Sequence, residues 1–145
     1  NVANSLILCG ALLGIEVRIA CPEGFEPEPF VIKKAREIYK NENLLKITND
    51  PHAAAKGSNV LYTDVWASMG EENQKKEKDK IFNGFTIDSD LVKKADKDAI
   101  ILHCLPAYRN KEITDEAIES ENSRIFKQAE NRLHVQQGLL ACLLS

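Results

Sequence analysis

The chain has 145 residues, of which 43% are hydrophobic and 28% are charged, and its formal net charge is -3. This length fits one domain with a single hydrophobic core, and the composition is typical of a globular protein. The 19 basic and 22 acidic residues form no basic stripe, which argues against nucleic acid as a partner.

The cysteines suggest a reducing compartment. They show neither a C-x-x-C pair nor the spacing of a metal finger, and most lie in apolar runs, where a reduced cysteine behaves as a small hydrophobic side chain. The four are Cys9, Cys21, Cys104 and Cys142. We therefore expect a cytoplasmic location. No apolar segment is long enough to span a bilayer, so no membrane is expected as a partner.

The first segment, "NVANSLILCGALLGIEV", predicts a buried helix. It has the short apolar core of a signal sequence but neither a basic leader nor a clear cleavage site. A helix that is apolar on most faces needs a sheet to pack against, and the chain opens inside this helix. We therefore expect a strand before Asn1 in a longer protein, of which these residues are a fragment.

Four short apolar runs predict strands, because they are continuous rather than alternating, as in a parallel sheet covered on both faces. They are Val17–Cys21, Leu44–Thr48, Val60–Asp64 and Ala99–Cys104.

Helical segments separate these strands. The longest, "PFVIKKAREIYKNEN" at 29–43, places four apolar residues close to helical spacing: Phe30, Ala35, Ile38 and Tyr39. A short helix at "PHAAAKG" ends at Gly57, and the highly charged segment 70–84 predicts a solvated helix. "DSDLVKKA" and "TDEAIES" both begin with residues that favour a helix N-cap.

The last helix begins near Gln128, with apolar residues three, four or seven positions apart: Ala129, Leu133, Leu140 and Leu144. Strands and helices that alternate in this way predict right-handed βαβ windings. We expect an α/β fold, a Rossmann-like three-layer αβα domain whose mostly parallel sheet lacks its first strand.

Three polar groups are expected at one edge of this sheet, because ligands of such folds bind at the carboxyl ends of the strands. They are Asp64, Cys104 and, at the start of the first helix, Asn1. Each has a structural alternative: Asp64 as a turn cap, Cys104 as a core thiol and Asn1 as a helix N-cap. Their position on one edge favours a site.

Several other classes of site are disfavoured by the sequence. The chain contains no G-x-G-x-x-G, no G-x-x-x-x-G-K-[ST] and no G-x-S-x-G, and its seven glycines are scattered. A dinucleotide site, a P-loop and an elbow-type serine nucleophile are therefore not expected. Neither a metal nor an organic cofactor is implied.

The segments "DVWASMG", "HCLP" and "QAENRLHVQQGLL" occur in this order and resemble the second, ornithine-binding domain of the ornithine carbamoyltransferase family. The resemblance spans residues 1–145, and "SMG" and "HCLP" separate this family from aspartate carbamoyltransferase. The family's other motifs, S-x-R-T and H-P-x-Q, are absent from the chain, so the resemblance implies that the carbamoyl-phosphate domain is absent too.

The resemblance implies an enzyme that transfers the carbamoyl group of carbamoyl phosphate to the δ-amine of ornithine, giving citrulline and phosphate. Asn1 and the backbone amide of Met69 would bind the α-carboxylate of ornithine, and Asp64 and Ser68 would accept from the α-ammonium. No Lys or Arg lies between Thr63 and Gly70, which favours an amino acid with a cationic side chain.

For the reaction itself the resemblance implies three residues. Cys104 would lie near the δ-amine, either as its proton acceptor or only to orient it. Arg132 would bond the carbamoyl oxygen, where negative charge grows. The Leu105 carbonyl would accept from the carbamoyl NH2, with the Leu105–Pro106 bond cis. His103 would make a structural hydrogen bond.

Alternatives remain open from sequence. Arg132 also fits a surface position on an amphipathic helix. The acceptor could be another amine such as putrescine, or the chain could be a non-catalytic α/β binding module. Family members are homotrimers, and the resemblance implies that assembly for the complete enzyme.

Overall fold

The computed structural model describes residues 1–39, 41–67 and 75–145. Its four strands are parallel, and in the described residues they form two hydrogen-bonded pairs rather than one continuous sheet. The first pair joins β1 (Val17–Ala20) to β2 (Leu45–Thr48), and the second joins β3 (Val60–Thr63) to β4 (Ile100–His103). The predicted α/β class with parallel strands is confirmed, and each predicted strand lies within one residue of its observed ends.

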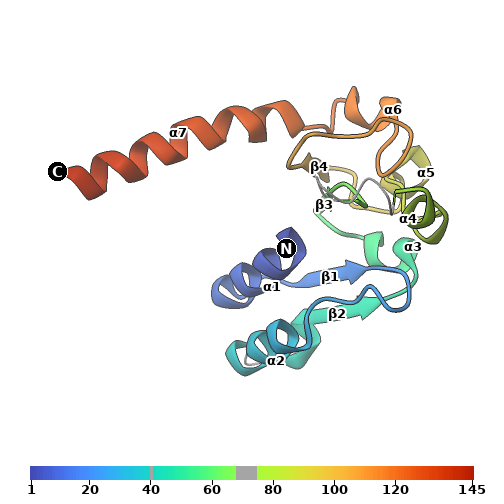
Figure 1. Ribbon diagram of the computed structural model, residues 1–145, viewed down its shortest axis with the longest axis horizontal. Helices are drawn as coiled ribbons and strands as arrows, with labels where there is room; N and C mark the ends of the chain where they lie inside the picture. Colours follow the sequence, from blue (N-terminus) through green and yellow to red (C-terminus); the bar gives the residue numbers. More distant parts are fainter. Residues whose placement is uncertain (40, 68–74) are drawn as a thin grey trace.

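The β1–β2 pair carries two helices, α1 (Val2–Leu13) and α2 (Pro29–Ile38), in the lower part of Figure 1. Gly14 ends α1 with a left-handed φ of 68°, which glycine adopts without strain. The first helix is predicted to be buried, but it is only partly so: Leu12 and Leu13 near its end are 72% and 70% exposed.

The helix predicted over 29–43 ends early, since Tyr39 takes an extended backbone and its hydroxyl donates to the Ile15 carbonyl at 2.6 Å. Its buried face differs from the predicted one. Val31, Ala35 and Tyr39 are buried at four-residue steps, whereas Phe30 is 73% exposed.

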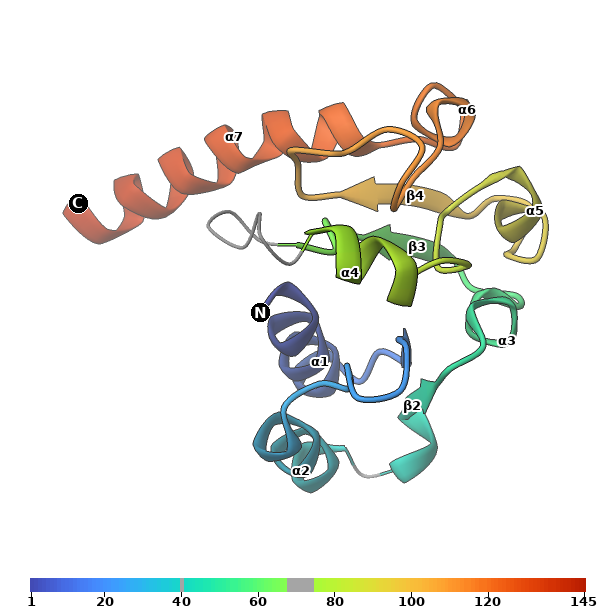
Figure 2. The ribbon, with the colours of Figure 1, turned by 45° about the vertical axis from the view of Figure 1, so that its right-hand side comes forward.

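A single short helix, α3 (Pro51–Ala55), connects β2 to β3. The Asp50 side chain accepts from the amides of His52 and Ala53 at 2.9 and 3.1 Å, which caps the start of α3. In the two ribbon views α3 lies between the two strand pairs (Figures 1 and 2).

The β3–β4 pair carries the remaining helices, which are α4 (Lys75–Ile81), α5 (Ser89–Val92), α6 (Asp115–Ile118) and α7 (Ile125–Leu144). There is also a short 3-10 turn, Glu42–Leu44, before β2. The charged helix predicted over 70–84 is found as α4, and residues 70–74 lie outside the described residues. α7 begins three residues before the predicted start.

α7 projects from the rest of the molecule (Figure 1). Ile125 at its start is fully buried, but the apolar residues farther along are exposed, including Leu133, Leu140 and Leu144 at 57%, 56% and 83%. The helical spacing predicted for them is therefore present, but the face they form is not buried in this structure. Among the described residues, no helix is both long enough and apolar enough to cross a bilayer.

Candidate functional site

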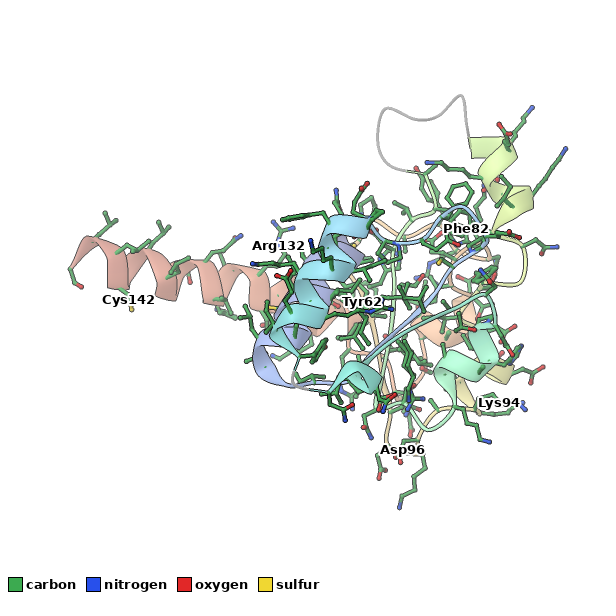
Figure 3. All side chains as sticks on the ribbon, turned by 90° about the horizontal axis from the view of Figure 1, so that it is seen from below. Tyr62, Phe82, Lys94, Asp96, Arg132 and Cys142 are labelled. Carbon is green, nitrogen blue, oxygen red and sulfur yellow. The ribbon has the colours of Figure 1, made fainter. Side chains whose placement is uncertain are left out.

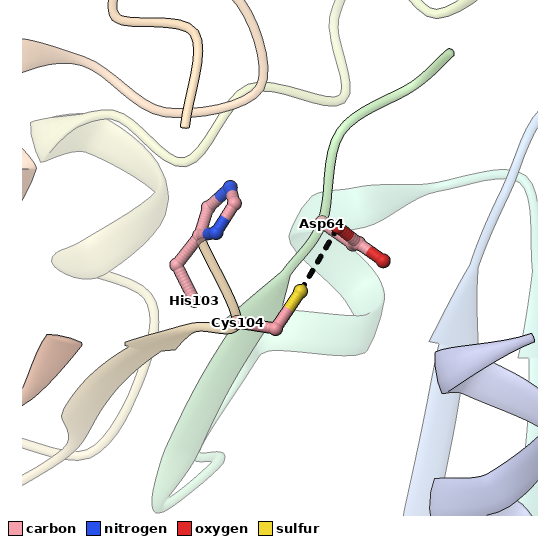
Figure 4. Close-up of side chains that lie close together, drawn as sticks. All are labelled: Asp64, His103 and Cys104. Carbon is pink, nitrogen blue, oxygen red and sulfur yellow. Dashed lines mark hydrogen bonds between the residues drawn. The ribbon is translucent and has the colours of Figure 1, made fainter. Parts of the chain in front are cut away.

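Asp64 and Cys104 meet at the carboxyl ends of β3 and β4. Thr63 is paired with His103 in the parallel register, so the residues that follow them leave neighbouring strand ends. The Cys104 thiol donates a hydrogen bond to Asp64 Oδ1 at 3.0 Å (Figure 4). The same oxygen accepts from the Val65 amide at 2.8 Å. The prediction that these two side chains share one edge is confirmed.

Burial and the neighbouring Asp64 carboxylate together keep the Cys104 thiol protonated. Burial of Cys104, together with its hydrogen bond to Asp64 and the charge of that carboxylate, raises the pKa of the thiol to about 11. A thiolate is disfavoured beside a negative group. At neutral pH the sulfur is therefore a hydrogen-bond donor rather than a base.

A second hydrogen-bonded group lies behind this pair and connects α7 to both strands. Gln128 Nε2 donates to the Tyr62 hydroxyl at 3.1 Å, and Gln128 Oε1 accepts from the His103 amide at 3.1 Å. Burial is the largest cause of the raised pKa of Tyr62, and the nearby Cys104 adds to it. Gln128 therefore fixes the first turn of α7 against the ends of β3 and β4.

His103 turns away from Cys104 into the interior, as predicted, and makes structural hydrogen bonds. Its Nε2 pairs with Glu112 Oε1 at 3.1 Å, and its Nδ1 accepts from the Leu105 amide at 2.8 Å. The Leu105–Pro106 bond is cis, as the resemblance implies, and Leu105 has a φ of 57°.

Three side chains lie close enough together to share a metal ion: a carboxylate oxygen of Asp64, a ring nitrogen of His103 and Sγ of Cys104 are all within 4.8 Å of one another. Both ring nitrogens of His103 already hold hydrogen bonds, so the imidazole offers no ligand atom without breaking them. We assign no metal to this group.

Cys104, Leu105 and Arg132 line one open cavity. Its volume is about 650 Å³, and the strand-tip loop lines it together with one face of α7; the residues are Cys104, Leu105, Pro106, Ala129, Arg132, Leu133 and Gln136. Arg132 lies where α7 leaves the body, whereas Cys142 lies near its far end (Figure 3). This placement unites three residues that the sequence named.

The other named residues are placed less completely. Asn1 is exposed directly before α1, and its side chain makes no capping hydrogen bond to that helix. The structural alternative of a side-chain N-cap is therefore not observed. Ser68 and Met69 lie outside the described residues.

Sequence reasoning missed Tyr62, Gln128 and Glu112. Glu112 is fully buried beside His103, yet it lies in a polar segment, "RNKEITDE", that gives no sign of burial. Tyr62 and Gln128 are 66 positions apart, and no periodic pattern links residues at such a separation. Gln128 lies in the "QAENR" segment, but the resemblance gives a role only to Arg132 there.

Comparisons with known protein families and sequences all relate the chain to the carbamoyltransferases. The sequence profile described as "Aspartate/ornithine carbamoyltransferase, Asp/Orn binding domain" matches residues 1–143. An ornithine carbamoyltransferase of Prochlorococcus marinus subsp. pastoris is 79% identical over 144 residues, which are 99% of this chain and 47% of that protein. One of Trichormus variabilis is 53% identical, with 99% and 47% covered.

Solved structures agree. The ornithine carbamoyltransferase of Pyrococcus furiosus superposes with a TM-score of 0.90 at 48% identity and covers 97% of this chain and 45% of its own. The anabolic enzyme of Campylobacter jejuni gives a TM-score of 0.87 at 41% identity, with 97% and 46% covered. The chain thus spans about half the length of the relatives it matches, and it belongs to the aspartate/ornithine carbamoyltransferase family, within the domain that binds the amino acid.

Proposed function

We propose that residues 1–145 are the ornithine-binding domain of an ornithine carbamoyltransferase. The reaction is transfer of the carbamoyl group from carbamoyl phosphate to the δ-amine of L-ornithine, which yields L-citrulline and phosphate. The observation that carries this proposal is that Cys104, Leu105 and Arg132 line the same cavity, and that Cys104 is hydrogen-bonded to Asp64. The names of the relatives supply the substrate.

In this proposal Asn1, Asp64, Ser68 and Met69 bind ornithine. The Asp64 carboxylate is a fitting acceptor for the α-ammonium group, and its orientation is set by two hydrogen bonds to one oxygen. Because the thiol of Cys104 has a raised pKa of about 11, we assign Cys104 the orientation of the δ-amine rather than the acceptance of its proton.

Arg132 and Leu105 act on the carbamoyl group. A guanidinium donor at the carbamoyl oxygen stabilises the negative charge that develops there during attack by the amine. The Leu105 carbonyl accepts from the carbamoyl NH2. Cys104 borders the same cavity, which supports a position between the two substrates.

The phosphate of carbamoyl phosphate requires groups outside these residues, so the isolated chain is proposed to bind ornithine without turning it over. We also infer a cytoplasmic location, supported by four free cysteines, and assembly of the complete enzyme as a homotrimer.

A chimera tests this function. The 145 residues replace the matching segment of the Prochlorococcus marinus relative, and citrulline formation is measured with ornithine and, in parallel, with putrescine as acceptor. We expect turnover with ornithine, a much slower reaction with putrescine, and elution as a trimer. The isolated chain should bind L-norvaline, an ornithine analogue without the δ-amine, and show no turnover.

Three results would contradict the proposal in whole or in part. A folded chimera without carbamoyl transfer to ornithine would remove the assigned reaction. Ordinary activity of the isolated 145 residues would show that the chain does not depend on a second domain. A preference for putrescine would keep the reaction class but replace the acceptor.

A further inference from the structure

We propose that His103 and Glu112 form a positioning pair that holds the backbone of Leu105 for the carbamoyl group. The inference rests on the proposed function, because that function assigns the Leu105 carbonyl to the carbamoyl NH2. Neither side chain lines the cavity, so the pair would act through Leu105 and not by touching substrate.

The pair is completely removed from solvent. The exposed fraction of both residues is 0%, and Nε2 of His103 lies 3.1 Å from Oε1 of Glu112. Buried polar groups are destabilising unless they are hydrogen-bonded. Within the described residues, Glu112 Oε2 is buried without a hydrogen-bond partner, which lowers the stability of the fold. A purely stabilising role therefore does not explain the pair.

The hydrogen bonds select one form of the imidazole. The Leu105 amide donates to Nδ1 at 2.8 Å, and an amide N–H can only donate, so Nδ1 must carry a lone pair. The ring proton is then on Nε2, which donates it to Glu112 Oε1. The opposite tautomer, or a doubly protonated ring, would break the bond to Leu105.

Glu112 holds the same loop at its other end. Its Oε1 also accepts from the Tyr108 amide at 2.6 Å. The two side chains therefore fix the segment from Leu105 to Tyr108 at both of its ends. Leu105 and Pro106, which border the cavity, lie in this segment.

Leu105 needs such support. Its φ of 57° lies in the left-handed region, where the backbone of a non-glycine residue is strained because the β-carbon crowds the neighbouring carbonyl. The bond from its amide to His103 favours this conformation directly. A displacement of the Leu105 carbonyl by a fraction of an ångström would misplace the carbamoyl group, and reaction rates are sensitive to such errors.

The test uses paired variants in the active chimera. His103→Phe keeps a ring but removes both nitrogens, whereas His103→Asn keeps an oxygen acceptor near the place of Nδ1. Glu112→Leu removes the acceptors, whereas Glu112→Gln keeps Oε1. We expect kcat to fall about tenfold or more in His103→Phe and Glu112→Leu, with most of it recovered in His103→Asn and Glu112→Gln.

Binding of the amino acid separates positioning from loss of the fold. The Kd for L-norvaline should stay within about twofold of wild type in all four variants, because their contacts do not reach the ornithine groups. An unchanged kcat in His103→Phe, or a rise in KM alone, would overturn the inference while leaving the proposed function intact.

A second measurement needs no variant. In the wild-type chain labelled with 15N histidine, the ring shifts of His103 should show a proton on Nε2 and none on Nδ1. A proton on Nδ1 at neutral pH would overturn the inference even if His103→Phe or Glu112→Leu failed to fold, or if the chimera were inactive and the proposed function had therefore failed.

Discussion

The Cys104 thiol and the Asp64 carboxylate set each other's chemistry at the scale of single residues. The carboxylate Oδ1 accepts from the thiol and from the Val65 amide, so its orientation is fixed before any ligand binds. The thiol in turn is kept protonated, with a pKa raised to about 11 by burial first and by Asp64 second. A protonated sulfur cannot take a proton from an amine, which is why orientation is the role we assign to it.

Asp64→Asn should make Cys104 more reactive. The carboxylate favours the thiol over the thiolate, so its removal lowers the pKa of Cys104 from about 11 toward its ordinary value, while the effect of burial remains. Since each unit of pKa changes the thiolate fraction about tenfold, alkylation by iodoacetamide at pH 8 should become several-fold to about tenfold faster. Peptide-resolved mass spectrometry measures the rate.

The matched control is Asp96→Asn, because Asp96 is exposed and precedes the amino end of β4, whereas Cys104 follows the carboxyl end of that strand. This variant should leave the alkylation rate of Cys104 unchanged. The exposed Cys142 should react equally in all proteins. Equal or slower alkylation of Cys104 in Asp64→Asn would show that the carboxylate does not hold the thiol protonated.

At the scale of elements, α1 depends on a close approach to β1. A β-carbon built on Gly10 would lie 2.4 Å from Val17 Cγ2 and 3.1 Å from the Tyr39 hydroxyl. Valine is stiff about its first side-chain torsion, and the Tyr39 hydroxyl is bonded to the Ile15 carbonyl. Neither neighbour can move away easily, so a glycine is required where α1 crosses the strand.

Gly10→Ala is therefore expected to destabilise the chain, by about 1–3 kcal/mol from overpacking, in spite of the better helix propensity of alanine. Gly138→Ala is the control: it also lies inside a helix, but apart from its own helical turn no described atom is within 4 Å of its built β-carbon. It should stabilise α7 by up to about 1 kcal/mol. Urea unfolding measures the free energy of unfolding of both variants. A change of the same sign in the two would contradict the packing argument.

The elements that sequence predicts best are the strands. Continuous apolar runs bounded by polar residues define all four within one residue. Helix limits are less certain, because tertiary contacts decide them: Tyr39 leaves α2 to bond Ile15. The buried face of α2 also differs from the prediction, since Phe30 is exposed and Val31 is buried.

The site likewise contains some residues that the sequence predicts and others that it does not. Strand ends and motif resemblance identified Cys104, Leu105 and Arg132, which the fold brings to one cavity. The supporting groups could not be predicted, because they are single polar residues that meet only in the folded chain. Glu112 reaches His103 across nine positions of irregular loop, and nothing in its neighbouring residues indicates burial.

At the scale of the whole molecule, the described residues contain two separate hydrophobic clusters. The β1–β2 cluster consists of Ile7, Ala11, Val31, Ala35, Tyr39 and Leu45. The β3–β4 cluster consists of Ala55, Leu61, Ile87, Leu91, Ile101, Ile113, Ala117, Ile118 and Ile125. They share no buried residue. The parts are connected by α3, which contacts both β1 and α5, and by the rings of Phe25 and Phe82, whose centroids lie 4.9 Å apart. Parts of a protein joined by few contacts can open separately.

Ile101→Ala tests whether the two clusters open separately. Ile101 is fully buried in the β3–β4 cluster, so its truncation should lower the local stability of that cluster by about 2–4 kcal/mol. Amide hydrogen exchange, measured by NMR, should accelerate at β3, β4 and the first turn of α7. Amides of α1 and β2 should be affected much less, because distant sites are nearly independent.

Ile7→Ala is the reciprocal variant, since Ile7 is fully buried in the β1–β2 cluster, and it should reverse the pattern. Equal acceleration throughout the chain in both variants would mean that the contacts between the two clusters couple them into one cooperative unit.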